Sequence, residues 1–326
     1  MANREEGPER WVDDVRRGDE GRFREAEERL WTSVEVEPTE RRLVLKRTGT
    51  TIRVQEVGDG PAVVFIHGAN NGGTSWASLV ARLEGFRCVL VDRPGCGLSD
   101  PIDTVFAGPE ELGAYAEGVV LDVLDGLGLD SADVVATSYG GCFALRTAAL
   151  HPDRVRRLVV YGWTLGAPMA KLPPIMRVAS LPGLRRVLNA VPPTRGAVRA
   201  LLGQIGLKQA VAAGRVTDEM VDWYHALLRD TPTVRQELAA TVNLLSPTGG
   251  LFDSLTLPPE LLARIEAPAY FLWGDGDPFG GPDVARAFVA QVPGAELELL
   301  PGAGHAVWMD DADLVAARTQ AFLTPA

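Results

Sequence analysis

Short, continuously apolar runs alternate with longer segments of helical periodicity along most of this chain. Residues 62–66 are apolar at every position, as expected for a strand buried on both faces of a parallel sheet. Similar strand-like runs lie at residues 42–45, 51–55, 88–91, 134–137, 158–161, 269–273 and 296–300. Strands that alternate with helices imply right-handed crossovers, so the pattern predicts an α/β fold with a doubly wound, mostly parallel, eight-stranded sheet.

The alternation breaks in two places. The densely charged residues 1–40 place apolar side chains at roughly helical spacing, which predicts an N-terminal helical arm. The arm either packs on the fold, mediates a dimer contact, or closes over a substrate pocket. Residues 164–262 are helix-like, rich in proline and free of buried-strand runs, which predicts a helical cap inserted between two halves of the core, 41–163 and 263–326.

Composition narrows the classes of partner. The chain has 326 residues, 46% of them hydrophobic, and a net charge of −11, which disfavours nucleic acid and anionic membranes as partners. Its three cysteines are widely spaced, so neither a disulfide framework nor a zinc site is expected, and no other metal or cofactor is implied. We find no signal peptide and no transmembrane run, so a cytoplasmic protein acting on a small molecule is expected.

Ser138 is the strongest candidate for chemistry. It follows the apolar run 133–136 and precedes the helix-like stretch 142–150, as a nucleophile does at a strand-to-helix turn. Such a turn strains the serine backbone and requires small neighbours, which Gly140 and Gly141 provide. Ala136 stands where the usual G-x-S-x-G pattern has its first glycine.

A serine hydroxyl needs a base, and the base needs a group that fixes its tautomer. Among the four histidines, His305 is favoured because it lies in a glycine-rich loop directly after the last predicted strand. The acid is expected after the strand that ends at residue 273. Asp277 is preferred there, and Asp275 is interpreted as a solvent-facing turn residue.

The oxyanion formed by attack on a carbonyl needs donors that are already in place. The backbone N–H of Tyr139, at the start of a helix, is one candidate. Ala69 is the other, because Gly68 lets the loop after the third strand bend close to the site. His67 is interpreted as a loop-shaping residue bonded to nearby backbone.

Several motifs in sequence order resemble the α/β-hydrolase fold superfamily, in its cap-bearing branch. They are His67-Gly68, the segment 91–100 (VDRPGCGLSD), the Ser138 turn, the segment 151–155 (HPDRV), the segment 273–278 (WGDGDP) and Gly304-His305. The resemblance covers about residues 41–163 and 263–326. It implies a catalytic triad at one edge of the sheet. Members with an aspartate nucleophile hydrolyse epoxides or carbon–halogen bonds, and Ser138 disfavours both reactions.

Three functions fit these residues. The first is a serine hydrolase that cleaves a small apolar ester or related acyl compound through an acyl-enzyme. The second is a carbon–carbon bond hydrolase, whose triad first helps a dienol to become a ketone. The third is non-hydrolytic, a pathway enzyme or ligand receptor. The residues that could line a pocket under the cap, and so decide between these functions, are Trp163, Met169, Met176, Trp223 and Tyr224.

The charged N-terminal arm also permits a homodimer.

Overall fold

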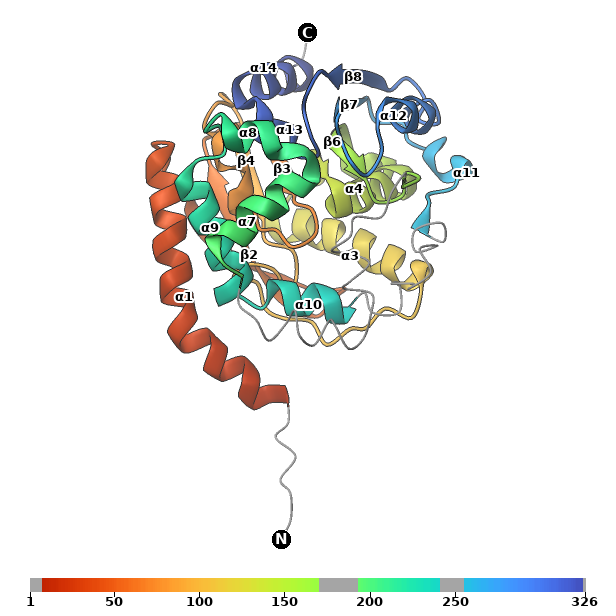
Figure 1. Cartoon of the computed structure of the whole chain (residues 1–326). Helices are drawn as coiled ribbons and strands as arrows, with labels where there is room; N and C mark the ends of the chain where they lie inside the picture. The colour runs from red at the N-terminus through yellow and green to blue at the C-terminus, as the bar shows by residue number, and fades with distance from the viewer. Residues whose placement is uncertain (1–7, 170–192, 241–254, 325–326) are drawn as a thin grey trace.

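A central sheet organises the chain (Figure 1). The computed structural model describes residues 8–169, 193–240 and 255–324, with side chains from residue 20 onward. Its eight strands are ordered β1-β2-β4-β3-β5-β6-β7-β8. They are β1 (Thr39–Leu45), β2 (Thr50–Val57), β3 (Ala62–Ile66), β4 (Arg87–Val91), β5 (Ala132–Thr137), β6 (Val155–Thr164), β7 (Ala269–Gly274) and β8 (Glu296–Leu300). The predicted α/β fold is thereby confirmed.

The sheet is antiparallel only at one end. β1 pairs with β2 and β2 with β4 in antiparallel fashion, whereas every pairing from β4 to β8 is parallel. In the middle, Val64 of β3 lies opposite Val89 of β4 and Val134 of β5. All five residues of β3 are buried, which explains its continuously apolar sequence.

Helices cover both faces of the sheet. One core is formed with α3 (Pro109–Leu127), α4 (Ser138–Leu150), α11 (Pro259–Leu262) and α12 (Pro282–Val289). The other is formed with α1 (Pro8–Ser33), η1 (Gly73–Trp76), α2 (Ala77–Val80), α13 (Val307–Asp310) and α14 (Ala312–Leu323). Because strand side chains alternate between faces, Val64 joins the first core and Phe65 the second.

The segment between β6 and β7, here called the insert, begins after Thr164 and ends before Ala269. Its described residues form helices and add no strand to the sheet. Besides α11 they are α7 (Arg195–Leu202), η3 (Gly203–Leu207), α8 (Lys208–Ala212), α9 (Asp218–Asp230) and α10 (Thr233–Ala240). Thr194 and Thr217 cap α7 and α9 by accepting backbone N–H groups. The predicted cap occupies this part of the chain, and its function as a cap stays a prediction.

The N-terminal helix α1 packs on the chain's own core. Phe23, Ala26, Leu30 and Trp31 are buried, whereas the side chains of Trp11 and Val15 lie outside the described part. The ring of Phe23 lies 6.4 Å from that of Trp223 in α9, and Arg22 bonds Asp230 at the end of α9. These contacts explain the periodicity of the arm as a packing face.

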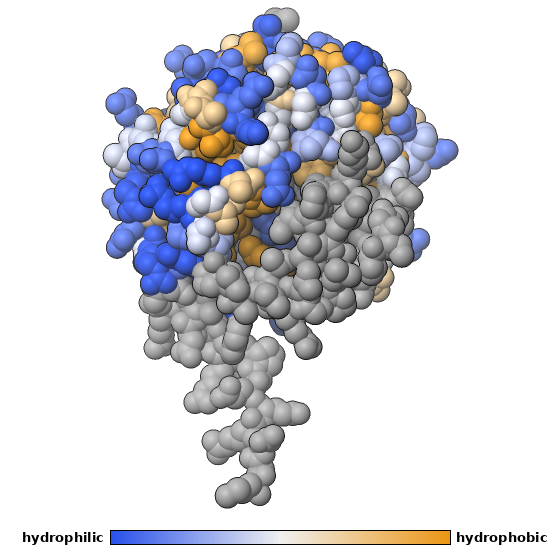
Figure 2. Space-filling view, viewed as in Figure 1, coloured by the Kyte–Doolittle hydropathy of each residue, from blue (hydrophilic) through white to orange (hydrophobic). Residues whose placement is uncertain are grey.

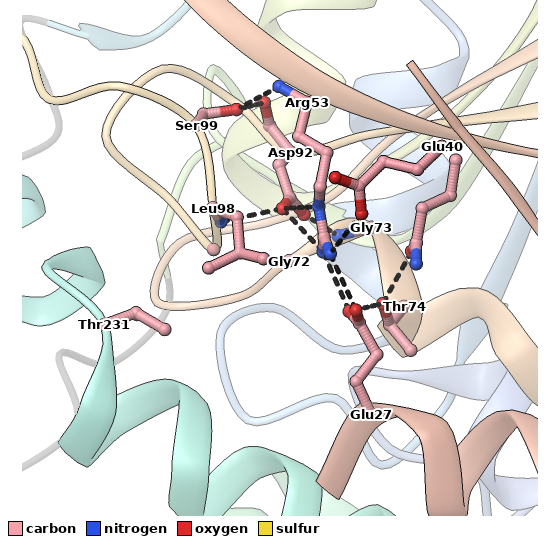
Figure 3. A network of polar contacts seen from close by, with 12 residues as sticks. Glu27, Glu40, Arg53, Gly72, Gly73, Thr74, Asp92, Leu98, Ser99 and Thr231 are labelled. Atoms are coloured by element: carbon pink, nitrogen blue, oxygen red, sulfur yellow. Dashed lines mark hydrogen bonds and ion pairs between the residues drawn. The ribbon is translucent and has the colours of Figure 1, made fainter. Parts of the chain in front are cut away.

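A buried ionic network joins α1 to the sheet (Figure 3). Arg53 of β2 donates two hydrogen bonds to Glu27 of α1, at 2.6 and 2.8 Å, and one to Asp92 at 2.8 Å. Burial alone would lower the pKa of Arg53, but Asp92 and then Glu27 outweigh burial and raise it. Asp92 also accepts the N–H groups of Gly73 and Leu98. Arg53 therefore stays charged and fixes α1, β2 and the loop after β4 together.

On the face shown in Figure 2, hydrophilic residues predominate among the coloured atoms, with scattered hydrophobic patches between them. No helix in the described ranges is long and apolar enough to cross a bilayer. The cytoplasmic location and the homodimer stay predictions.

The buried network predicts a stability effect. Replacing Glu27 by Gln removes one charge from a bidentate pair with Arg53 and should lower the free energy of unfolding by about 3 kcal/mol. Urea unfolding of the two proteins measures the difference. Glu28→Gln, at the exposed neighbouring position, is the control and should change stability by less than about 0.5 kcal/mol. A Glu27→Gln protein as stable as the control would contradict the role of the network.

Candidate active site

Ser138 lies at the junction between β5 and α4, in a backbone conformation that few L-residues adopt. Its φ is 53°, in the left-handed region. Two glycines permit the junction, because a Cβ on Gly140 would lie 2.4 Å from the Ile66 carbonyl oxygen and one on Gly141 would lie 2.1 Å from Thr164 Oγ1. The strained turn at Ser138 is therefore held by close packing against β3 and β6.

The loop after β3 passes directly over this junction. A Cβ on Gly68 would lie 2.9 Å from Ser138 Cβ, so only glycine allows this approach. His67 is buried in the same loop, and its Nδ1 lies 2.8 Å from the Gly68 carbonyl oxygen while its Nε2 accepts the N–H of Arg93. Burial and then the charge of Arg93 hold the pKa of His67 well below its usual value. His67 is thus neutral, with its proton on Nδ1.

His305 and Asp277 meet at the ends of two neighbouring strands. Nδ1 of His305 lies 2.8 Å from Oδ2 of Asp277, and that oxygen also accepts the backbone N–H of Trp163. The other carboxylate oxygen of Asp277 accepts the N–H of Phe279. Asp277 is thereby held as a buried acceptor beside Nδ1 of His305.

The loop of His305 rests on the insert. The N–H of His305 donates to the Ile205 carbonyl oxygen at 2.9 Å. Next to this bond two glycine backbones touch, because a Cβ on Gly206 would lie 2.7 Å from Gly304 Cα. The position of the imidazole therefore depends on η3 as well as on β8.

One cavity joins the candidate residues. Its volume is about 210 Å³, and Ser138, His305, Ala69 and Tyr139 all line it. Most of the remaining lining is apolar and includes Trp163, Met169, Leu202, Ile205, Phe279 and Trp308. Asp277 lies behind His305, whose ring meets that of Phe279 edge-on. The structure thus gathers the predicted residues at one place, and their roles in catalysis stay predictions.

Some of the residues predicted to line a pocket do line the cavity, and others do not. Of the five predicted from sequence, Trp163, Met169 and Tyr224 line the cavity. Trp223 is fully buried against Phe23, and Met176 lies outside the described residues. Asp275 is exposed and accepts the N–H of Gly302, as expected of a turn residue.

No cluster of three or more potential metal-ligating side chains occurs in the ranges that the structure describes. Cys88, Cys96 and Cys142 are buried and free. In the described part of the chain, Ser138 and the residues around it are the remaining candidates for chemistry.

Sequence comparison places the chain among hydrolases. The model of the "Alpha/beta hydrolase family" matches residues 63–318. A 2-hydroxy-6-oxononadienedioate/2-hydroxy-6-oxononatrienedioate hydrolase of Burkholderia vietnamiensis is 31% identical over 277 residues, which cover 79% of this chain and 86% of the relative. A 2-hydroxy-6-oxo-6-phenylhexa-2,4-dienoate hydrolase of Burkholderia cepacia is 26% identical, covering 83% and 91% of the two chains.

Solved structures share the fold. A 2-hydroxy-6-oxo-6-phenylhexa-2,4-dienoate hydrolase from Rhodococcus matches with a TM-score of 0.69 and 22% identity, covering 88% of this chain and 99% of its own. Naproxen esterase from Bacillus subtilis matches with a TM-score of 0.72 and 19% identity, covering 94% and 99%. At 22% and 19% sequence identity, both matches show a shared fold and nothing more specific.

Asp310 adds a titrating group beside the His305 loop. Its Oδ2 accepts the N–H of Gly304 at 2.7 Å, and its Oδ1 is buried with no hydrogen-bond partner among the described residues. Burial raises the pKa of Asp310 to about 6, although the bond from Gly304 acts in the opposite direction. Sequence reasoning missed this residue because it belongs to none of the recognised motifs.

The raised pKa of Asp310 predicts a pH-dependent stability. Between about pH 4 and 6 the folded state keeps a proton that the unfolded state has lost, so the free energy of unfolding falls as pH rises through that window. Asp310→Asn keeps an acceptor for Gly304 without the charge. The free energy of unfolding of the variant, relative to that of the parent protein, should rise by about 1–2 kcal/mol between pH 4 and pH 7. Urea unfolding across this range measures it, and a constant difference would contradict the assignment.

Proposed function

Because the chain belongs to the alpha/beta hydrolase family, we propose that it is a serine-dependent hydrolase. Its reaction is the cleavage of a carbon–carbon bond next to a ketone in a 2-hydroxy-6-oxo-dienoate type of compound. The observation that carries the proposal is the mostly apolar cavity lined by both Ser138 and His305, with His305 bonded to Asp277. The relatives at 26–31% identity support the choice of substrate class.

Proton transfer follows from the hydrogen bonds of the imidazole. With its Nδ1 proton directed at Asp277, His305 has Nε2 free to take the Ser138 proton. The buried carboxylate then stabilises the imidazolium that forms. Ser138 Oγ adds to the substrate carbonyl carbon, and the new oxyanion accepts the N–H groups of Ala69 and Tyr139. Each such donor stabilises the transition state by about 3 kcal/mol.

Cleavage requires a leaving group that can hold an electron pair on carbon. In a 2-hydroxy-dienoate, the first step is conversion of the dienol into its keto tautomer. The electron pair of the broken bond then spreads into the conjugated 2-oxo-acid as an enolate, and His305 returns the proton taken from Ser138 to that enolate. Water, activated by His305, hydrolyses the acyl-enzyme, so the net reaction adds one water across the bond.

The insert has two proposed roles in this reaction. As the predicted cap, it encloses the apolar end of the substrate among side chains such as Leu202, Ile205 and Met169. It also excludes water from the ketone before attack. The acidic balance of the chain supports a small-molecule substrate over a nucleic acid.

Ester hydrolysis is the second candidate. Among the described residues, the cavity lining contains no Lys or Arg that would pair with a substrate carboxylate. This observation favours a neutral ester, and it agrees with the leading hypothesis from the sequence. The serine chemistry is the same, with an alkoxide as leaving group instead of a carbanion.

A substrate comparison tests the proposal. The protein should consume 2-hydroxy-6-oxo-6-phenylhexa-2,4-dienoate with a kcat/KM at least roughly 100 times that for p-nitrophenyl butyrate, a difference of about 3 kcal/mol in transition-state stabilisation. Loss of the dienolate absorbance and release of p-nitrophenol are the two signals. The reverse preference would assign the protein to the esterases.

Ser138→Ala separates covalent from non-covalent chemistry. The variant should lose at least about 10³-fold in kcat on either substrate, because water alone replaces the nucleophile. The midpoint of thermal unfolding of the variant should not fall, because alanine keeps the Cβ of the serine and removes no packing contact of the junction. Retained turnover in this variant would refute the serine mechanism.

A further inference from the structure

Arg93 holds the loop that carries one of the two proposed oxyanion donors. It follows β4 directly, and its side chain is 4% exposed. Nε donates to the His67 carbonyl oxygen at 3.1 Å, and Nη2 donates to the Gly68 carbonyl oxygen at 2.9 Å. In the sequence, Arg93 is part of the motif at residues 91–100.

These bonds orient the N–H of Ala69. In a trans peptide, the carbonyl of one residue and the N–H of the next point in opposite directions. The Gly68 carbonyl is fixed toward Arg93 and the Nδ1 proton of His67. The N–H of Ala69, in the same peptide plane, must therefore point away from Arg93. Because Ala69 lines the cavity, Arg93 determines whether this donor faces the reacting carbonyl.

The charge of Arg93 is balanced by a residue of the insert. Glu237 of α10 forms a buried ion pair with Arg93, and its own side chain is 11% exposed. Burial is the largest influence on the pKa of Arg93 and lowers it, but Glu237, Cys96 and Tyr139 together raise the pKa above its usual value. The second oxygen of Glu237 accepts the N–H of Asn70 at 3.1 Å. One carboxylate of the insert thus contacts the loop directly and also through Arg93.

Asn70 needs this support because its own conformation is strained. Its φ is 51°, in the left-handed region, and it directly follows Ala69. On the opposite side, the Arg93 guanidinium lies 4.6 Å from the ring centre of Tyr139, the residue of the other proposed donor. The Arg93–Glu237 pair therefore contacts the residues on both sides of the proposed oxyanion site.

The far end of the loop has a separate anchor. Asp92 accepts the N–H of Gly73 at 2.7 Å, and Thr74 bonds Glu27 and Gln55 within the network of Figure 3. Loss of Glu237 should for that reason disturb residues 67–71 and leave η1 in place.

We propose that Glu237 is a positioning residue, which sets the direction of the Ala69 N–H through Arg93 and Asn70. The inference rests on the proposed function, since it assigns Ala69 a donor role in serine catalysis. It follows that the oxyanion site forms only when α10 is seated on the core. The insert then contributes to the chemistry at both ends, through Glu237 at the oxyanion loop and through Ile205 at the His305 loop.

Glu237→Gln tests the proposal. The amide keeps the shape of the side chain but places an uncharged group against the buried guanidinium. With p-nitrophenyl butyrate, kcat should fall roughly ten- to hundredfold while KM stays within about twofold. The inhibition constant of phenylboronic acid, which forms a tetrahedral adduct with serine and occupies the oxyanion site, should rise by a similar factor. Glu260→Gln, on the exposed face of α11, is the control and should match the parent protein.

The outcomes separate this inference from the proposed function. If phenylboronic acid does not inhibit the parent protein and Ser138→Ala retains turnover, the serine mechanism itself fails. If both behave as a serine enzyme requires but Glu237→Gln keeps the parent kcat and inhibition constant, the positioning role is overturned. A Glu237→Gln protein with raised KM and unchanged kcat would overturn it as well.

A double variant covers the case in which Glu237→Gln does not fold. Replacing the pair by Arg93→Met with Glu237→Leu removes both buried charges and should restore folding. The restored protein should still show the loss in kcat and the weakened phenylboronic acid inhibition, because the carbonyls of His67 and Gly68 have lost their donor. Full activity in the folded double variant would show that the pair only stabilises the fold.

Discussion

Close backbone packing around Ser138 is the constraint on which the rest of the site depends. The serine keeps a left-handed φ because Gly140 and Gly141 let α4 lie against β3 and β6 without side-chain clashes. Gly68 lets the next loop pass over the same point. A strained residue persists only where its surroundings determine it, and here three glycines make those surroundings possible. The position of Ser138 beside the cavity, with the loop after β3 close to it, depends on this packing.

The insert is tied to the loops on either side of the serine. Through η3 it touches the His305 loop by a hydrogen bond and a glycine contact, and through Glu237 of α10 it pairs with Arg93, which bonds the loop after β3. Meanwhile α9 is held by α1, which is fixed to the sheet through Arg53. Fold stability and site geometry are therefore linked by buried polar groups, since each leaves an unpaired partner when removed.

Much of this arrangement was predictable from sequence, for identifiable reasons. The strand at residues 62–66 matches the structure because a continuous apolar run marks a strand buried on both faces. Residues 296–300 instead alternate Glu and Leu at first, and they form the partly exposed edge strand β8. Ser138, His305 and Asp277 could be predicted to lie together because candidate residues in this fold follow strand ends in a fixed order, and the structure brings them to one place. Glu237, Ile205 and Asp310 were not found, because they act through contacts across the fold that leave no local pattern. Helix α3 was also missed.

The central claim is that Ser138 is a nucleophile whose proton is taken by His305. Covalent labelling with a fluorophosphonate, followed by mass mapping of the adduct, tests it most directly. We expect one adduct, on Ser138, and we expect it to form much more slowly in a His305→Ala protein. An active protein that acquires no adduct on Ser138, or labels equally fast without His305, would contradict it.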